Sequence, residues 1–263
     1  MKNKCAVVLC GGKGSRLGLL GKKIPKTLVK AQGKEILWYI IKYLKFSGFN
    51  HIILPTGYKG NQIKDFLKKN NSFGIKIEAI QTGINSNIGP RISKIIDRIN
   101  EKNFLLLNGD AIFDIDLISI YKKHYKKNYA ATFLSGEVTY PYGSIGVVKN
   151  KVIDFRRNLV FDQLKVRNNS NYIGYNFTGI CLIKTEILKK YNYLFKNSKN
   201  FEQTFYPRII KKHLTNLIKI DGFWHSIDNI KDLAAVDQKE RKNYKYTTLK
   251  KIKKFLMQNM TIN

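Results

Sequence analysis

Short apolar segments alternate with amphipathic segments through the first 110 residues of the chain. Mostly apolar runs, typical of strands buried in a parallel sheet, lie at 4–10, 51–54, 76–80 and 104–107. Segments with apolar residues at helical spacing lie between them at 35–46, 59–69 and 90–99. This alternation predicts an α/β fold with a doubly wound, mostly parallel sheet that binds ligands at the carboxyl ends of its strands.

The pattern becomes less regular after residue 110. We expect helices at 117–126 and 201–213, and strands at 130–134, 144–148, 152–155, 177–183 and 217–220. No internal repeat or clear linker divides the chain. We therefore predict one domain over residues 1–240, with a front half at 1–115 and a β-rich rear half at 116–240. A basic helix at 241–263 is expected to follow.

The formal net charge of +30 admits a nucleic-acid-binding protein as an alternative. However, 40 of the 48 cationic residues are Lys, and they are spread along the whole chain. We interpret them as a solvated surface and expect neither a nucleic-acid partner nor a membrane partner. The three cysteines lie in apolar runs, and no stretch approaches the roughly 18 apolar residues of a membrane span, so we expect a cytoplasmic protein.

A glycine-rich loop follows the first apolar run. It reads Gly-Gly-Lys-Gly-Ser-Arg-Leu at 11–17 and ends in Pro-Lys at 25–26. The stretch 9–28 holds five glycines and five cationic residues, and it contains no acid. Backbone amides at adjacent glycines can approach phosphates, and Arg16 can bind two phosphate oxygens. The pattern is neither a Walker loop nor a dinucleotide-binding loop, but it predicts a phosphate site that includes Lys26.

This loop pattern resembles the signature of the sugar-phosphate nucleotidyltransferases, the pyrophosphorylase family. The segments 33–66 and 222–233 are similar to glucose-1-phosphate cytidylyltransferases, and 105–117 resembles heptose-1-phosphate guanylyltransferases. The resemblance spans roughly residues 6–237, and it is thin between 126 and 201. It implies a Rossmann-like fold and an enzyme that joins a nucleoside triphosphate to a sugar 1-phosphate and releases pyrophosphate.

The resemblance also implies roles for individual residues. The loop residues that would surround the nucleotide are Leu9, Gly11, Gly12, Gly14 and Ser15. Arg16 would bind the departing phosphates, and Lys26 would bridge the α-phosphate and the attacking phosphate. Asp110 and Asp228 match the two aspartates that bind Mg²⁺ in the family, and hard carboxylate oxygens suit that ion. A lone aspartate after a strand is otherwise often a helix cap.

Base recognition is expected after the third strand. Thr82, Gly89 and Arg91 occupy the segment that reads the base in the family, and Arg91 could reach a pyrimidine carbonyl. The alternative is that Pro90 and Arg91 only open a helix. We expect CTP, with a GTP-dependent heptose- or mannose-1-phosphate guanylyltransferase as the alternative.

The rear half departs from the family pattern. Many members have Glu-Lys-Pro where this chain has Arg156-Arg157-Asn158, so we expect Arg156 or Arg157 to hold the acceptor phosphate. The other expected acceptor contacts are Lys26, Tyr142, Gly143, Asn176 and Glu202. The departure leaves open a non-sugar phosphate acceptor or an inactive homologue. We also expect a homo-oligomer.

Overall fold

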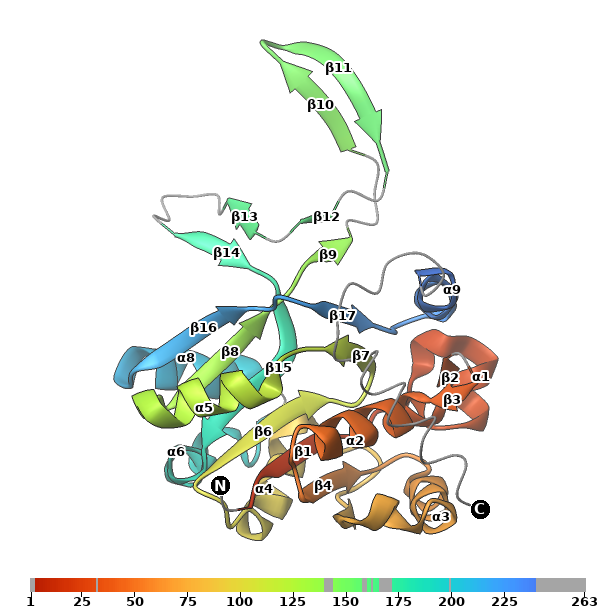
Figure 1. The fold of residues 1–263 in the computed structure, drawn as a ribbon, viewed down its shortest axis with the longest axis vertical. Helices are drawn as coiled ribbons and strands as arrows, with labels where there is room; N and C mark the ends of the chain where they lie inside the picture. Colours follow the sequence, from red (N-terminus) through yellow and green to blue (C-terminus); the bar gives the residue numbers. More distant parts are fainter. Residues whose placement is uncertain are drawn as a thin grey trace.

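The computed structural model describes residues 3–31, 33–139, 144–157, 160–161, 163–165, 172–198 and 200–239. A seven-stranded sheet lies at its centre (Figure 1). From one edge to the other its strands are β16 (Thr215–Lys219), β8 (Ala131–Ser135), β15 (Phe177–Lys184), β6 (Asn103–Asn108), β1 (Cys5–Leu9), β4 (His51–Thr56) and β5 (Lys76–Gln81). The sheet therefore contains strands from both the front half and the rear half of the chain.

Six of the seven strands run in one direction, and β15 alone runs against its two neighbours. Starting from β1, the chain adds β4 and then β5 on one side, whereas β6 is added on the other side of β1. Doubly wound sheets open a crevice at such a position, here between β1 and β6. The predicted α/β class with a mostly parallel sheet is confirmed. The rear strands extend the same sheet because β15 and β8 pair onto β6 in succession.

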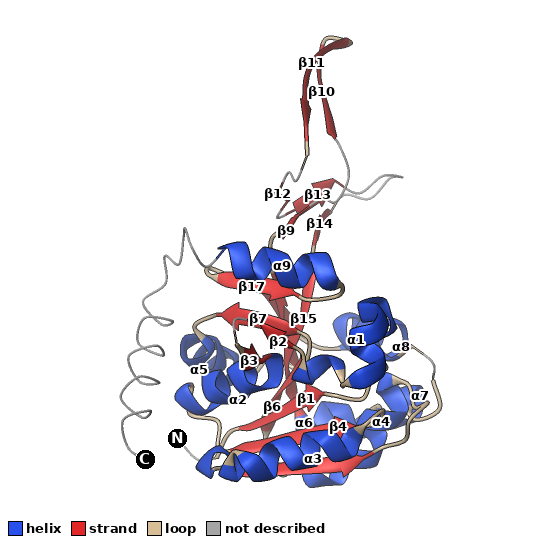
Figure 2. Cartoon of the chain, turned by 90° about the vertical axis from the view of Figure 1, so that its right-hand side faces the viewer, coloured by secondary structure: helices blue, strands red, loops and turns tan. Residues whose placement is uncertain are grey.

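Helices cover both faces of the sheet (Figure 2). One face packs against α2 (Ile36–Phe46), α3 (Gly60–Lys69) and α5 (Leu117–Lys127). The other face packs against α4 (Ile88–Ile95), α6 (Thr185–Lys190), α7 (Asn192–Phe195) and α8 (Phe201–Lys212). Along β1, Ala6 and Val8 point into the first layer, whereas Cys5 and Val7 point into the second. Burial on both faces explains why this strand is continuously apolar.

A two-stranded pair near the carboxyl end of β6 was not expected from the sequence. β17 (Phe223–Ser226) pairs antiparallel with β7 (Ala111–Asp114), with Ser226 opposite Ala111. The Ile227 N–H then donates to the Asp110 carbonyl over 2.9 Å. The next helix, α9 (Ile230–Lys239), begins directly after this pair. The pairing returns the end of the described chain to the end of β6.

A ribbon formed by β10 (Ser144–Val148) and β11 (Lys151–Arg156) projects from the body of the molecule (Figure 1). These two predicted strands exist, but they pair with each other and do not join the central sheet. The remaining described elements are α1 (Gly18–Lys23), β2 (Lys30–Ala31), β3 (Lys34–Glu35), β9 (Val138–Thr139), β12 (Val160–Phe161), β13 (Gln163–Lys165) and β14 (Ile173–Tyr175).

Two expectations fall outside the described residues, namely Tyr142 with Gly143 and the basic helix at 241–263. Among the residues that are described, no helix combines the length and the apolar character needed to cross a membrane.

Candidate active site

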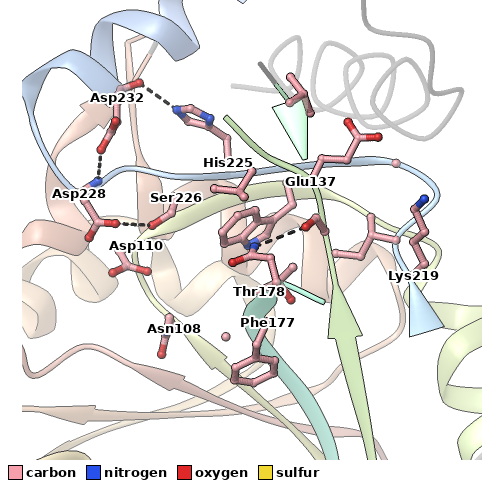
Figure 3. A pocket seen from close by; sticks show the side chains of 18 of the residues that line it. Asn108, Asp110, Glu137, Phe177, Thr178, Lys219, His225, Ser226, Asp228 and Asp232 are labelled. Atoms are coloured by element: carbon pink, nitrogen blue, oxygen red, sulfur yellow. Dashed lines mark hydrogen bonds between the residues drawn. The ribbon is translucent and has the colours of Figure 1, made fainter. Parts of the chain in front are cut away.

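A cavity of about 1140 Å³ opens at the carboxyl edge of the sheet (Figure 3). Asn108 and Asp110 enter it from the end of β6, and Gly136 and Glu137 follow β8. Since β15 runs antiparallel, its beginning lies at the same edge, and Thr178 lines the cavity there. The segment that follows β16 and the β17 pair close the remaining side. The cavity thus lies at the edge of the sheet where the sequence analysis predicted ligand binding.

The described lining of this cavity is acidic although the chain is strongly basic. Its carboxylates are Asp110, Glu137, Glu202, Asp221, Asp228 and Asp232, and its ammonium group is Lys219. Carboxylates accept hydrogen bonds from hydroxyl groups and attract cations. The cavity therefore suits a hydroxyl-rich molecule together with a metal ion.

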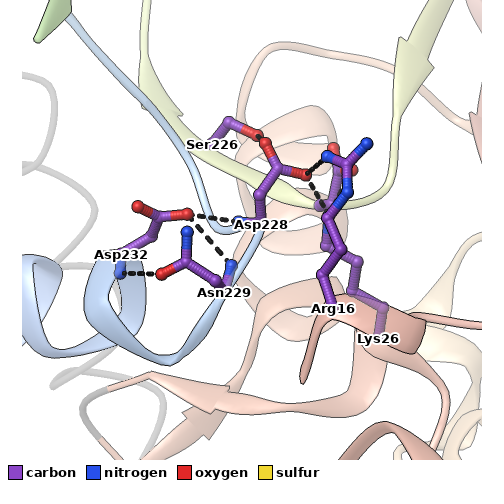
Figure 4. A network of polar contacts seen from close by, with 7 residues as sticks. Arg16, Lys26, Ser226, Asp228, Asn229 and Asp232 are labelled. Carbon is purple, nitrogen blue, oxygen red and sulfur yellow. Dashed lines mark hydrogen bonds and ion pairs between the residues drawn. The ribbon is translucent and has the colours of Figure 1, made fainter. Parts of the chain in front are cut away.

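Lys26 contacts both of the aspartates that the sequence analysis selected as metal ligands. Figure 4 shows Lys26 and Arg16 beside Asp228. Its Nζ is 2.8 Å from Asp110 Oδ2 and 2.8 Å from Asp228 Oδ1. Only 15% of the Lys26 side chain is exposed, so burial alone would lower its pKa. The charge of Asp110 and the contact with Asp228 outweigh that effect, and the net result is a raised pKa of Lys26. The cationic, protonated form of Lys26 is therefore strongly favoured at this position.

Asp228 is held from several directions. Burial tends to raise the pKa of its carboxyl group, but the Lys26 ammonium and the Ser226 hydroxyl hold it below its usual range. The Ser226 Oγ donates to Asp228 Oδ2 over 3.1 Å. Asp232 Oδ2 accepts the backbone N–H groups of Asp228 and Asn229 over 2.8 and 3.0 Å. Asn229 Oδ1 in turn accepts the Asp232 N–H, which makes a capping box at the start of α9.

The donor set at this position fits a hard divalent cation. Asp110 and Asp228 supply carboxylate oxygens that already share one ammonium group, and Mg²⁺ prefers such ligands together with water and phosphate oxygens. Arg16 stands at the edge, where its guanidinium lies 3.5 Å from Asp228 Oδ1 and its side chain is 77% exposed. It is thus accessible to an anion that approaches from solvent.

Arg91 lies behind the glycine-rich loop and is buried. Its guanidinium donates to the carbonyls of Gly11 and Thr56 over 2.9 and 3.0 Å, and to Thr82 Oγ1 over 2.8 Å. A Cβ atom on Gly11 would lie 2.1 Å from this guanidinium, so only glycine permits the contact. The structure thus places Arg91 and Thr82 in a clamp that holds the loop backbone. This placement differs from the expected direct approach to a base.

The predicted glycines of this region have different surroundings. Gly12 faces open space, as a backbone that approaches a ligand requires, and the nearby Ser15 is exposed. Gly14 has φ +62°, a conformation that favours glycine, and its carbonyl packs closely on Gly21. A Cβ atom on Gly89 would lie 2.3 Å from the Phe195 carbonyl. Gly89 therefore permits α4 to approach α7, and this contact gives it a packing role.

Leu9 acts through its backbone at the end of β1. Its carbonyl accepts the Gly109 N–H over 3.1 Å, which ties the loop after β1 to the turn that precedes Asp110. A Cβ atom on Gly109 would lie 2.7 Å from this carbonyl. The close approach positions the two segments that carry Lys26 and Asp110.

The predicted acceptor residues are only partly brought together. Asn176 and Glu202 line the cavity. Arg156 and Arg157 do not line it, because β11 leads away from the sheet into the projecting ribbon, where Arg156 Nε pairs with Asp154 Oδ2 at 2.7 Å. This placement differs from our expectation that one of these two arginines holds the acceptor phosphate.

Several lining residues were not selected from the sequence, namely Glu137, Lys219, Asp221, Trp224, Ser226 and Asp232. Lys219 is the last residue of β16, and Glu137 and Asp221 lie two residues after β8 and β16, so their position at strand ends could have indicated them. Trp224, Ser226 and Asp232 depend on the β17–β7 pairing, for which the local pattern held no signal.

Comparisons with known proteins agree with this geometry. The family model for nucleotidyl transferases matches residues 5–242. A probable glucose-1-phosphate cytidylyltransferase of Bacillus subtilis (strain 168) is 29% identical over 254 residues, which cover 89% of this chain and 94% of that protein. A D-glycero-alpha-D-manno-heptose 1-phosphate guanylyltransferase of Aneurinibacillus thermoaerophilus is 29% identical over 153 residues, 57% of this chain and 66% of that protein.

A solved structure shares the fold. The crystal structure of HddC from Yersinia pseudotuberculosis, complexed with GMP-PN, superposes with a TM-score of 0.63 at 23% identity. The superposition covers 90% of this chain and 99% of that one.

Proposed function

This chain belongs to the nucleotidyl transferase family, and within it we propose a Mg²⁺-dependent enzyme that joins CTP to a sugar 1-phosphate. Its relatives support the coarser statement that it is a sugar-phosphate nucleotidyltransferase. The observation that carries the proposal is the position of Lys26 between Asp110 and Asp228, two aspartates that line a large cavity.

Asp110 and Asp228 would hold the metal ion. When bound, Mg²⁺ would neutralise triphosphate charge and orient the phosphates. Lys26, which contacts the same two carboxylates, would bind phosphate oxygens when those carboxylates hold the metal ion. Arg16 would bind the departing β- and γ-phosphates, as its exposure and its position at the edge of the site allow.

The reaction needs no nucleophilic side chain. An oxygen of the acceptor phosphate attacks the α-phosphorus of the triphosphate, a new P–O bond forms, and the bond to the β-phosphate oxygen breaks. Pyrophosphate leaves with the electron pair of that bond. The protein contributes positioning and charge neutralisation, chiefly through Lys26 and Arg16.

CTP is the proposed nucleotide. It is supported by the relative named as a probable glucose-1-phosphate cytidylyltransferase, whose similarity covers 89% of this chain. GTP is the competing choice, because the similarity to the heptose 1-phosphate guanylyltransferase covers 57% of the chain. The clamp formed by Arg91 and Thr82 would act by holding the loop that surrounds the nucleotide.

The acceptor would lie in the acidic part of the cavity. Asn176 and Glu202 can accept hydrogen bonds from sugar hydroxyls, and the acceptor phosphate would point toward Lys26. Since Arg157 does not line the cavity, we expect Arg157→Lys to leave the KM for the acceptor unchanged. A raised KM for the acceptor would instead show that Arg157 contributes to acceptor binding.

The test is a specificity matrix. The protein is incubated with Mg²⁺, each of the four nucleoside triphosphates, and glucose 1-phosphate, mannose 1-phosphate, heptose 1-phosphate or phosphocholine, and pyrophosphate release is measured. We expect the highest rate with CTP and a sugar 1-phosphate. A clear preference for GTP would assign the chain to the guanylyltransferases, and a preference for phosphocholine would assign a non-sugar acceptor.

Two variants complete this experiment. Asp110→Asn should abolish pyrophosphate release, whereas the exposed Asp65→Asn should retain it. Metal-dependent nucleotide binding without turnover on any acceptor would identify an inactive homologue. Self-association and a cytoplasmic location stay predictions.

A further inference from the structure

A second cluster of metal-ligating side chains lies at the opposite edge of the sheet from the cavity. Cys5 begins β1 and His51 begins β4, and the two residues are register partners in the parallel pair. Glu101 precedes β6, the neighbour of β1 on the other side. One ligand atom from each of the three residues lies within 4.8 Å of the other two. These atoms are thus close enough to surround a single ion.

The cluster is buried, and one of its oxygen atoms lacks a partner. Cys5 is 0% and His51 is 5% exposed, and 12% of the Glu101 side chain is exposed. Within the described part of the chain, Glu101 Oε2 is buried and has no hydrogen-bond partner. Buried carboxylate oxygens are almost always satisfied, so an oxygen of this kind needs an explanation.

His51 is oriented as a metal-binding histidine would be. Its Nε2 lies 2.7 Å from Glu78 Oε1, so an Nε2–H donated to Glu78 leaves the Nδ1 lone pair on the side of Glu101. Nδ1 lies 3.3 Å from Glu101 Oε1. A carboxylate that accepts the distal N–H of a ligating histidine fixes its ring orientation and raises its basicity.

A simple ion pair explains this arrangement less well. A protonated His51 between Glu78 and Glu101 would satisfy Glu101 Oε1, but it would leave Oε2 without a partner. Among the ion pairs of the described residues, Lys76 and Arg98 both pair with Glu78 and neither pairs with Glu101. These ion pairs therefore leave Glu101 Oε2 as an oxygen of the cluster that still needs a partner.

We propose that Cys5, His51 and Glu101 bind a zinc ion, with Glu78 as the carboxylate that orients His51. A thiolate, an imidazole and a carboxylate form a donor set typical of Zn²⁺. The Cys5 thiol releases its proton to solvent when the metal binds.

The role of this ion is structural, because the cluster lies at the amino ends of the strands and the cavity lies at their carboxyl ends. The zinc ion would cross-link β1, β4 and the segment before β6. It would therefore raise the stability of the fold without entering the reaction.

The first test is metal binding to the whole chain. The protein is dialysed against Zn²⁺ with excess Mg²⁺, which occupies carboxylate sites, and bound zinc is counted by elemental analysis. We expect one zinc ion per chain in the wild type and loss of that ion in Cys5→Ser. Cys181→Ser removes an equally buried cysteine outside the cluster and should retain the zinc. Equal zinc content in Cys5→Ser and wild type would overturn the proposal.

The second test does not depend on how well a variant folds. Titration of the wild type with Co²⁺ should give a thiolate-to-metal charge-transfer band and tetrahedral d–d bands, which Cys181→Ser keeps. Absence of the thiolate band in the wild type would overturn the proposal. Glu78→Gln should weaken zinc binding about 10- to 100-fold while the zinc ligands stay in place. An unchanged affinity would show that Glu78 does not orient His51 toward a metal.

A third measurement separates this site from the active site. Zn²⁺ should raise the melting temperature of both wild type and Asp110→Asn, and it should not raise that of His51→Gln. If Zn²⁺ also raised the melting temperature of His51→Gln by the same amount, the ion would be bound elsewhere. These outcomes do not depend on nucleotidyl transfer, so they stand whether or not the proposed activity is found.

Discussion

Lys26 Nζ lies 2.8 Å from Asp228 Oδ1, although 202 positions separate the two residues in the chain. Lys26 lies at the end of the glycine-rich loop that follows β1. The β17–β7 pair positions Asp228 near the end of β6. The contact therefore joins the first and last described parts of the fold at the point where phosphates would be transferred. It places one ammonium group in contact with both carboxylates.

Replacement of Lys26 tests this arrangement. Lys26→Ala should lower kcat by about 10²- to 10³-fold, as expected when one group that stabilises transition-state charge is removed. It should also destabilise the protein in the absence of Mg²⁺, because Asp110 and Asp228 then lose the ammonium group that contacts both of them, while the exposed Arg16 contacts Asp228. Mg²⁺ should consequently raise the melting temperature of Lys26→Ala more than that of the wild type. Steady-state kinetics and thermal unfolding with and without Mg²⁺ measure both effects.

Lys23→Ala is the matched control, since it removes an exposed lysine from the same segment. It should leave both kcat and the response to Mg²⁺ unchanged. If the two lysine variants behaved alike, the position of Lys26 between the carboxylates would have no functional consequence.

Asp232 should act as a positioning residue for Asp228. Its Oδ2 accepts the Asp228 and Asn229 backbone N–H groups, so Asp232→Ala frees the segment that carries Asp228. We expect about 1 kcal/mol of lost stability from the helix cap, together with a higher Mg²⁺ concentration for half-maximal activity. Lys231→Ala, on the same turn of α9, should change neither quantity. An unaltered Mg²⁺ requirement in Asp232→Ala would limit its role to capping the helix.

Arg91 should be sensitive to a conservative change. The Arg91 guanidinium donates to the Gly11 carbonyl and to Thr82 Oγ1 at the same time, and a lysine ammonium cannot reproduce that geometry. Arg91→Lys should destabilise the fold by about 1–3 kcal/mol, because buried acceptors lose their donors. It should also raise the KM for the nucleotide by loosening the loop. Arg98→Lys, at an exposed arginine, should be neutral in chemical denaturation and in kinetics.

His124 should make stability depend on pH. It is buried with Nδ1 2.8 Å from Thr132 Oγ1 and Nε2 3.2 Å from Asn103 Oδ1, an arrangement that satisfies one neutral tautomer. Burial, assisted by the charge of Lys184, lowers the pKa of His124 to about 4. The unfolded chain binds a proton near pH 6.5 and the folded chain does not. His124 therefore contributes stability that is complete above pH 6.5 and is lost as the pH falls toward 4, by up to about 3 kcal/mol.

The check for this prediction is thermal unfolding at several pH values between 4 and 7. The wild type should lose stability progressively on acidification, and His124→Gln should show a flatter profile over the same range. Parallel profiles for the two proteins would show that protonation of another group causes the loss.

Much of the fold was predictable from local patterns. The continuous apolar run of β1 indicated a strand covered on both faces, and the helical spacing at 35–46 indicated α2. Both signals are local, because a continuous apolar run and a 3.6-residue repeat are each visible within a few consecutive positions of the chain. The loop motif likewise indicated a phosphate site, since closely spaced glycines and cations are sufficient to recognise it.

The direction in which a functional side chain points was not predictable in the same way. Arg91 follows the third strand at a position that suggested contact with a base, yet it turns inward to bind the loop carbonyls. Gly89 suggested close approach to a ligand, yet its neighbour is the Phe195 carbonyl on α7. In both cases the partner lies far away in the sequence, so no local pattern could reveal it.

The sequence by itself determined the α/β class and the glycine-rich loop that includes Lys26, and its resemblance to a known family selected Asp110 and Asp228. Only the tertiary structure decided that these three side chains meet and that Arg156 lies on a ribbon away from the cavity. The physical reason is how far apart along the sequence the interacting residues lie. Helix and strand periodicity arises within a few residues, whereas β17–β7 pairing and the antiparallel entry of β15 depend on contacts formed only when the whole sheet assembles.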